Sequence, residues 1–127
     1  MSSAGHMKRI SLSVVSHRQG GMVNDLLGDV ARYSPSLDLH LTCNVPEQTL
    51  FHSDGLQHFH RFDNANAQGF GANHNAAFQH CDSPFFCVCN PDVRLVNDPF
   101  PELIACMEDP KVGVVAPRVL APAAGWE

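Results

Sequence analysis

Residues 10–43 read ISLSVVSHRQGGMVNDLLGDVARYSPSLDLHLTC, and this stretch decides the fold expected of the chain. Residues 10–16 alternate and then become continuously apolar, which is typical of a buried strand. After a glycine-containing turn, the apolar residues of 22–34 recur at helical spacing up to a proline. Residues 37–43 alternate with period two and predict a second strand. A strand, a helix and a strand in this order predict a parallel pair of strands.

The rest of the chain continues this alternation. The sequence predicts strands at 56–62, 84–89 and 112–116, and a helix at 72–80. Another helix is expected to start at Asp98-Pro99, with Asp98 as cap and Pro99 in the first helical position. This order indicates an α/β fold with a mostly parallel sheet and helices on both faces. In such sheets ligands bind beyond the carboxyl ends of the strands, where the strand order reverses.

Composition narrows the function classes. The chain has 127 residues, 44% hydrophobic and 17% charged, as expected of an ordinary globular domain. Its formal net charge of -5 argues against a nucleic-acid partner and against chain-wide attraction to an anionic membrane. No apolar run is long enough to span a bilayer, and no signal peptide is recognisable. Five cysteines without a CxxC pair then favour free thiols and a cytoplasmic location.

A carboxylate follows the apolar strand expected at 84–89, in the motif Asn90-Pro91-Asp92. The carboxyl end of a buried strand lies at the rim of the expected cleft. A hard divalent cation held by one or two carboxylates keeps water and phosphate oxygens as its other ligands. Asp92 therefore either supplies one oxygen to such a cation, with Asn90 adding an amide oxygen or holding the turn, or the tripeptide is only a turn.

A glycine-rich segment, residues 64–75, precedes and opens the helix expected at 72–80. Gly69 and Gly71 allow close backbone approach to a ligand, and the free N–H groups of a helix start bind anions such as a diphosphate. The alternative is a plain glycine-rich connection, and for Phe70 itself packing in the core is the favoured interpretation. Neither a GxGxxG fingerprint, a phosphate-binding P-loop nor a GxSxG elbow occurs in the sequence.

Other polar residues offer weaker signals. His17 and Arg18 end the first strand at the expected cleft, and Arg18 is the arginine best placed for a diphosphate. His58 and His60 share one strand face, which suits either a metal pair or, as the favoured interpretation, a solvated face. A zinc site is disfavoured, because the spacing of its candidate ligands matches no common zinc pattern; these ligands are His80, Cys81, Cys87 and Cys89.

In their order, these motifs resemble the inverting family 2 glycosyltransferases of the GT-A fold, especially the rhamnosyltransferase-like branch. The matching segments, within residues 10–120, are Ser13-Val-Val-Ser16, Asn64 to Ala77, Asn90-Pro-Asp-Val93 and Asp109-Pro-Lys-Val-Gly-Val-Val-Ala-Pro-Arg118. The resemblance implies a GT-A-like (Rossmann-like) domain at 9–120. The sequence itself predicts a disordered leader or tag remnant at 1–8 and a tail at 121–127. The resemblance leaves two interpretations of that tail, a cut from a longer chain or the end of a naturally short relative.

The resemblance also implies transfer of a sugar, with inversion, from a nucleoside-diphosphate-sugar to a glycan or lipid-linked acceptor hydroxyl, as in cell-surface polysaccharide biosynthesis. Asp92 would bind Mg²⁺ or Mn²⁺ as part of a DxD-like motif and bridge it to the diphosphate. The implied nucleotide and sugar pocket is formed by Ser16, His17, Arg18, Asn44, Asn64, Gly69, Phe70, Gly71, Asn75 and Asn90.

Two positions depart from the family pattern: Cys43 stands where an Asp is usual, and Ala67 where an Asn is usual. No residue is assigned as the catalytic base, which the later half of family members carries. Three hypotheses follow: a glycosyltransferase, a short non-catalytic nucleotide-binding relative, or a structural protein with an empty pocket. A homodimer is expected if a sheet edge is left uncovered. The resemblance further implies peripheral membrane association, through the later half that family members carry.

Overall fold

The computed structural model describes residues 10–118. These form two compact units, one ending at Val96 and one beginning at Asn97. The elements of the first unit are β1 (Ile10–Ser16), α2 (Gly20–Tyr33), β2 (Asp38–Cys43), β3 (His58–Asp63), α3 (Phe70–Gln79) and β4 (Phe85–Cys89). The second unit contains α4 (Phe100–Met107). The sheet is entirely parallel, with the strand order β3-β2-β1-β4. The expected α/β fold with a parallel sheet is therefore confirmed at the level of a Rossmann-like arrangement.

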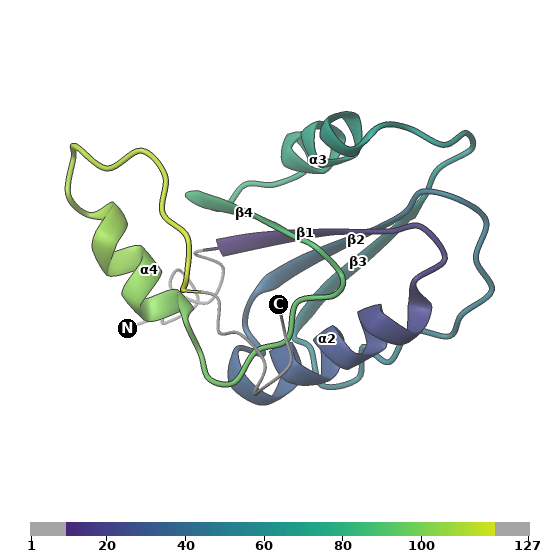
Figure 1. The fold of residues 1–127 in the computed structure, drawn as a ribbon, viewed down its shortest axis with the longest axis horizontal. Coiled ribbons are helices and arrows are strands. Elements are labelled where there is room, and N and C mark those ends of the chain that lie inside the picture. The colour runs from purple at the N-terminus through teal and green to yellow at the C-terminus, as the bar shows by residue number, and fades with distance from the viewer. Residues whose placement is uncertain (1–9, 119–127) are drawn as a thin grey trace, which may run out of the picture. The chain divides into compact units, whose positions relative to one another are not determined.

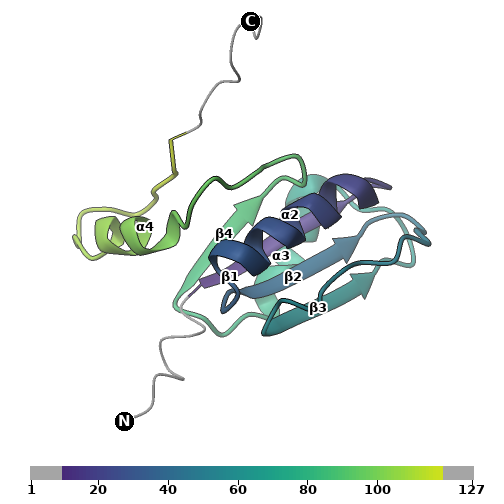
Figure 2. The same cartoon turned by 90° about the horizontal axis from the view of Figure 1, so that it is seen from below.

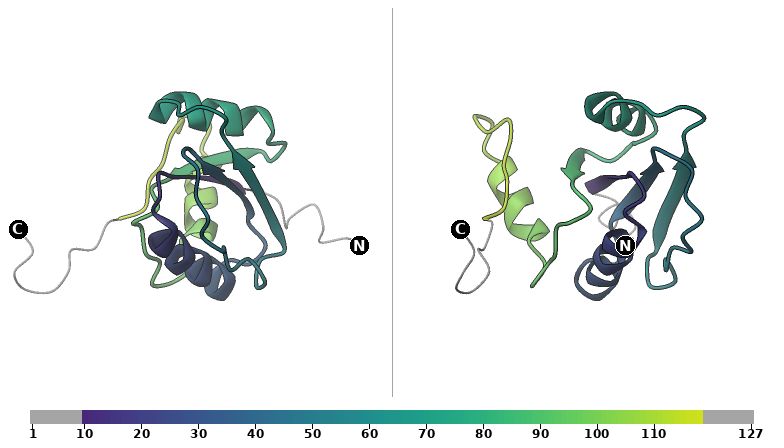
Figure 3. Two further views of the ribbon diagram at one scale, coloured as in Figure 1. Left: turned by 90° about the vertical axis from the view of Figure 1, so that its right-hand side faces the viewer. Right: turned by 45° about the vertical axis from the view of Figure 1, so that its right-hand side comes forward.

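One helix covers each face of the sheet, α2 on one side and α3 on the other (Figure 1; Figure 3). The side chains of β1 explain both contacts, because successive residues of a strand point to opposite faces. Ser13 faces α3, where its hydroxyl meets His74. Leu12 and Val14 therefore face α2 and are 2% and 1% exposed. Figure 2 shows α2 lying across the strands on this face, where its buried residues Val23, Leu26, Leu27 and Val30 complete the apolar core.

The α3 face of the sheet is much more polar than the α2 face. Along β2 the apolar residues Leu39, Leu41 and Cys43 alternate with three polar residues, Asp38, His40 and Thr42. All six are buried, because a helix covers each side of this central strand. The period-two pattern that predicted a strand is thus correct, but its polar positions are covered by protein rather than by water.

Two local expectations are wrong in detail. Residues 112–116 pair with no strand within the described part of the chain, and Val114 is 88% exposed. Its apolar run lacks the hydrogen-bonded neighbour that a strand requires. Pro99 is the N-cap residue of α4 rather than its first helical residue, while Asp98 still accepts a hydrogen bond from the Phe100 N–H at 3.1 Å. The expected leader, 1–8, and tail, 121–127, lie outside the described residues.

Within residues 10–118, no helix is long and apolar enough to cross a membrane.

Candidate functional site

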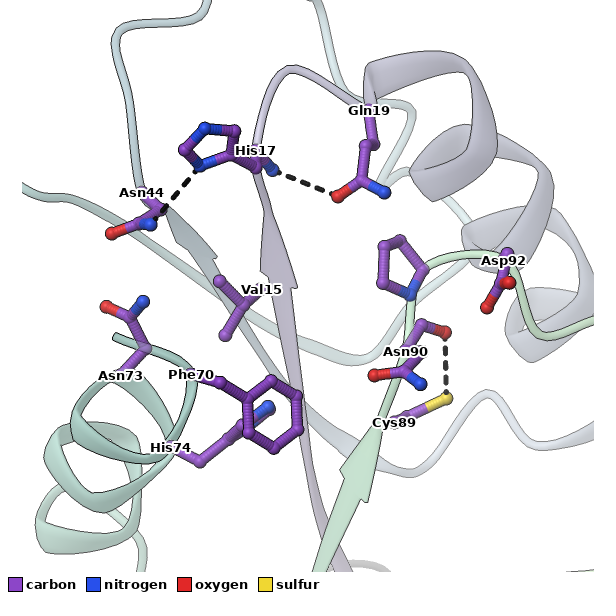
Figure 4. A pocket seen from close by; sticks show the side chains of 11 residues that line it. Val15, His17, Gln19, Asn44, Phe70, Asn73, His74, Cys89, Asn90 and Asp92 are labelled. Carbon is purple, nitrogen blue, oxygen red and sulfur yellow. Dashed lines mark hydrogen bonds between the residues drawn. The ribbon is translucent and has the colours of Figure 1, made fainter. Parts of the chain in front are cut away.

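A pocket lies where the strand order of the sheet reverses. The chain leaves β1 through α2 to reach β2 on one side, whereas β3 leads through α3 to β4 on the other side of β1. Crevices at such switch points, beyond the carboxyl ends of the strands, are the usual ligand sites of open α/β sheets. The pocket here has a volume of about 370 Å³ (Figure 4). Its lining residues are Val15, His17, Gln19, Asn44, Phe70, Asn73, His74, Cys89, Asn90, Pro91 and Asp92.

Five residues predicted from the sequence line this pocket: His17, Asn44, Phe70, Asn90 and Asp92. They come from the ends of three strands and the start of α3, and the fold brings them together. Packing of Phe70 in the core, the interpretation favoured from the residues alone, is wrong: its side chain is 62% exposed at the pocket.

The other predicted residues do not line the pocket. Ser16 is fully buried, and its hydroxyl donates to Glu47 Oε1 at 2.7 Å. Arg18 has a positive φ of 60°, and its Nε donates to the Pro46 carbonyl oxygen at 3.3 Å. Gly69 is the N-cap of α3, with the exposed Gly71 and Asn75 within the helix. Asn64 contacts Asn44 and Asn73, which line the pocket, but does not line it itself.

The side chain of Asn44 ties the pocket together. Its Oδ1 accepts hydrogen bonds from the Gln68 N–H at 2.7 Å and from Asn64 Nδ2 at 2.9 Å. Its Nδ2 donates to the Gln68 carbonyl oxygen at 3.0 Å and lies 3.3 Å from His17 Nδ1. The backbone N–H of Gln68 only donates and its carbonyl only accepts, so the amide orientation is fixed. His17 Nδ1 must then accept, which places the proton of the neutral ring on Nε2.

A second amide extends this network to α3. Asn64 Nδ2 also donates to Asn73 Oδ1 at 2.7 Å, and Asn73 is 2% exposed in the first turns of the helix. The asparagines at 44, 64 and 73 therefore fix the start of α3 above the end of β2. The N-cap residue is Gly69, which has no side chain to cap the helix start. The N-terminus of α3 is thus positioned by side-chain amides and keeps its positive end available to an anion.

His74 contributes a buried, neutral imidazole to the pocket wall. Burial lowers the pKa of His74, so the ring stays uncharged at neutral pH. Its Nδ1 lies 2.8 Å from Ser13 Oγ, and its Nε2 is buried without a hydrogen-bond partner among the described residues. The Phe70 ring packs edge-on against it, with 4.5 Å between ring centroids.

Two arginines of the first unit, Arg61 and Arg94, are engaged in ion pairs away from the pocket. Arg94 donates to both carboxylate oxygens of Asp29, at 2.8 and 3.1 Å. Arg61 pairs with Asp63 at 3.1 Å. No arginine or lysine lines the pocket within the described part of the chain, and Asp92 is its one carboxylate there. A ligand with a diphosphate would therefore depend on the start of α3 and on a cation for charge compensation.

Several residues that line the pocket were not predicted from the sequence, chiefly Gln19 and Asn73. Gln19 Oε1 accepts the His17 N–H at 3.1 Å, so this side chain shapes the turn after β1 (Figure 4). Its position three residues past a strand end was the available signal. Asn73 had no such signal, because its inward direction depends on how α3 lies over the sheet.

Comparisons with protein-family models, with curated proteins and with solved structures find no match for this chain.

Proposed function

We propose that the pocket binds a nucleoside-diphosphate-sugar together with Mg²⁺ or Mn²⁺, and that the protein acts in sugar transfer of the family 2 glycosyltransferase type. One observation carries the proposal. Residues 17, 44, 70, 90 and 92, which the resemblance names for donor binding, lie far apart in the sequence but line one pocket at the switch point. A donor site of this type requires that these positions converge, and the parallel sheet brings the strand ends that carry most of them to one edge.

The pocket chemistry suits the parts of such a donor. Phe70, Val15 and Pro91 offer apolar surface to a base or sugar ring. The side-chain amides of Gln19 and Asn90 provide donors and acceptors for hydroxyl groups. The start of α3 favours the diphosphate, and a cation on Asp92 would offset its remaining charge and stabilise the leaving nucleotide. Because no arginine lines the pocket within residues 10–118, binding is expected to need the cation.

Transfer with inversion needs a base that removes the acceptor hydroxyl proton. Among residues 10–118 the pocket offers only Asp92 and the two histidines as candidates, and Asp92 has its role in holding the cation. The second candidate function is therefore donor binding without transfer. Release of labelled sugar from the bound donor distinguishes the two, since a binding module holds the donor intact.

The test is thermal unfolding with UDP, dTDP and GDP, each with and without Mn²⁺, on the wild type and on Asp92→Asn. A ligand present at 100 times its Kd adds about 2.7 kcal/mol to the stability of the state it binds, which is a measurable shift. We expect one nucleotide to raise the midpoint in the presence of Mn²⁺ only, and Asp92→Asn to abolish that shift. Asp82→Asn is the matched control, because this exposed aspartate precedes β4 at its opposite end.

A nucleotide shift that Asp92→Asn leaves unchanged would refute the metal assignment. If no nucleotide shifts the midpoint under any condition, the donor site itself is refuted, and the fold would serve assembly rather than ligand binding.

A further inference from the structure

A second polar cluster lies on the α3 face of the sheet, outside the pocket. Asp38 and His40 come from β2 and His60 from β3. His40 Nε2 lies 3.0 Å from Asp38 Oδ2, and His60 Nε2 lies 2.9 Å from Asp38 Oδ1. One ligand atom from each of the three residues lies within 4.8 Å of the other two. His60 thus converges with residues of the neighbouring strand rather than with His58.

The cluster is buried on one side and open on the other. Asp38 is 4% exposed and His40 is 2% exposed, whereas the His60 side chain is 47% exposed. The Ser11 hydroxyl also reaches Asp38 Oδ2, at 3.3 Å, and so helps to orient the carboxylate. The two imidazoles stack at a centroid distance of 4.7 Å. Packing therefore fixes two ligands, and the third gives access from solvent.

We propose that Asp38, His40 and His60 form a binding site for Zn²⁺. Two imidazoles and a carboxylate are a common three-residue ligand set for zinc, with water in the fourth position. Bonds of 2.0–2.1 Å in a tetrahedron place neighbouring ligand atoms about 3.3 Å apart. The two histidines meet different oxygens of Asp38, at 3.0 and 2.9 Å, so rotations of the exposed His60 and of the Asp38 carboxylate would bring one oxygen within reach of both nitrogens and admit the ion. Mg²⁺ prefers an all-oxygen shell and fits these ligands poorly.

Zinc binding requires an unprotonated nitrogen on each imidazole. Each Nε2 faces the Asp38 carboxylate, and because an ionised carboxylate only accepts, each Nε2 carries the proton when no ion is bound. His40 Nδ1 is buried and has no hydrogen-bond partner among residues 10–118. The ring proton can therefore move from Nε2 to Nδ1 without breaking another hydrogen bond. This frees the His40 Nε2 lone pair for the ion.

The site is separate from the nucleotide pocket. Asp38 begins β2, whereas Asn44 of the pocket follows the other end of the same strand. Bound zinc would link β2 to β3, which is an edge strand of the sheet. We therefore expect zinc to stabilise the fold independently of Asp92 and of any nucleotide.

The experiment uses the full chain, stripped with a chelator and titrated with Zn²⁺ against a chromogenic competitor. Co²⁺ is then used as a spectroscopic probe. The wild type should bind one Zn²⁺ and show visible Co²⁺ d–d bands without a thiolate charge-transfer band. The variant His60→Ala should weaken the affinity at least about tenfold, as expected when a ligand is lost. His58→Ala is the control, because it removes a histidine from the same strand and face.

Equal loss in His58→Ala and His60→Ala would overturn the ligand assignment. A thiolate-to-cobalt band would do the same, because it would place the ion on a cysteine. His60 is half exposed, so its variant is expected to fold; far-UV circular dichroism checks this. If His60→Ala folds and still binds one Zn²⁺ with wild-type affinity, the site is refuted. Asp92→Asn should leave Zn²⁺ binding unchanged, so failure of the nucleotide proposal does not affect this test.

Discussion

The most informative single substitution is Asn44→Ala, because one side chain holds three segments in place. The Asn44 amide connects the turn after β1, the loop before α3 and, through Asn64, the helix itself. Asn44 is only 7% exposed, so water does not compete for the hydrogen bonds of its side-chain amide in the folded protein. Alanine removes all of these hydrogen bonds and adds no steric conflict.

The structure sets the size of the effect. Three hydrogen bonds of Asn44 are short, at 2.7, 2.9 and 3.0 Å, and the contact with His17 Nδ1 is longer, at 3.3 Å. At about 0.5–1.5 kcal/mol each, the three short bonds contribute roughly 1.5–4.5 kcal/mol. Residues 65–68 are exposed, so their freed groups can bind water once the loop opens. We therefore expect the free energy of unfolding to fall by about 2–3 kcal/mol.

Urea unfolding followed by circular dichroism measures this loss, and the midpoint should fall with an unchanged slope. Asn75→Ala is the control, because Asn75 is exposed on α3, where alanine favours the helix; its effect should stay within about 0.5 kcal/mol. Asn44→Ala should also weaken any nucleotide binding, since the start of α3 loses its support. A stability loss below about 0.5 kcal/mol would refute the role assigned to the amide network.

Two further predictions concern ionisation in the first unit. Hydrogen bonds from Arg94 hold the pKa of Asp29 below its ordinary value of 3.8, so this pair stabilises the fold above that pH and loses its effect as pH falls through the lowered pKa. Asp29→Asn should therefore cost about 1 kcal/mol at pH 7, with Arg94 partly exposed. In urea titrations the difference from wild type should shrink as pH falls below 3.8 and vanish only below the lowered pKa; a constant difference would contradict this. Burial raises the pKa of the Cys43 thiol to about 11. At pH 8 iodoacetamide should therefore label Cys43 at least about a hundredfold more slowly than the exposed Cys106, as followed by peptide mass spectrometry. Comparable labelling rates would show that Cys43 is accessible.

Local patterns predicted most of the elements. The period-two alternation of residues 37–43 and the apolar run at 84–89 both correspond to strands, since neighbouring residues alone set which side chains share a face. The run at 112–116 has the same local character but forms no strand in the described structure. Pairing depends on a neighbouring strand, and no local pattern contains that information.

Strand ends also gave part of the pocket. His17, Asn44 and Asp92 follow three separate strands, and parallel strands present these ends at one edge. The sequence does not predict that Asn73 points toward the pocket or that Arg18 donates a hydrogen bond to the Pro46 carbonyl oxygen, because both depend on how a helix or loop packs. The same is true of Asn64, which holds other side chains in place rather than lining the pocket.

The sequence by itself therefore determined the α/β class, the parallel sheet and the strand ends that line the pocket, because these depend on the order and periodicity of nearby residues. Only the tertiary structure decided the strand order β3-β2-β1-β4 and the separation of two polar sites along β2. It also brought His60 of β3 beside Asp38 and His40 of β2, although a loop separates these two strands in the sequence. Such contacts arise from the register between strands, and register is fixed by packing across the whole sheet.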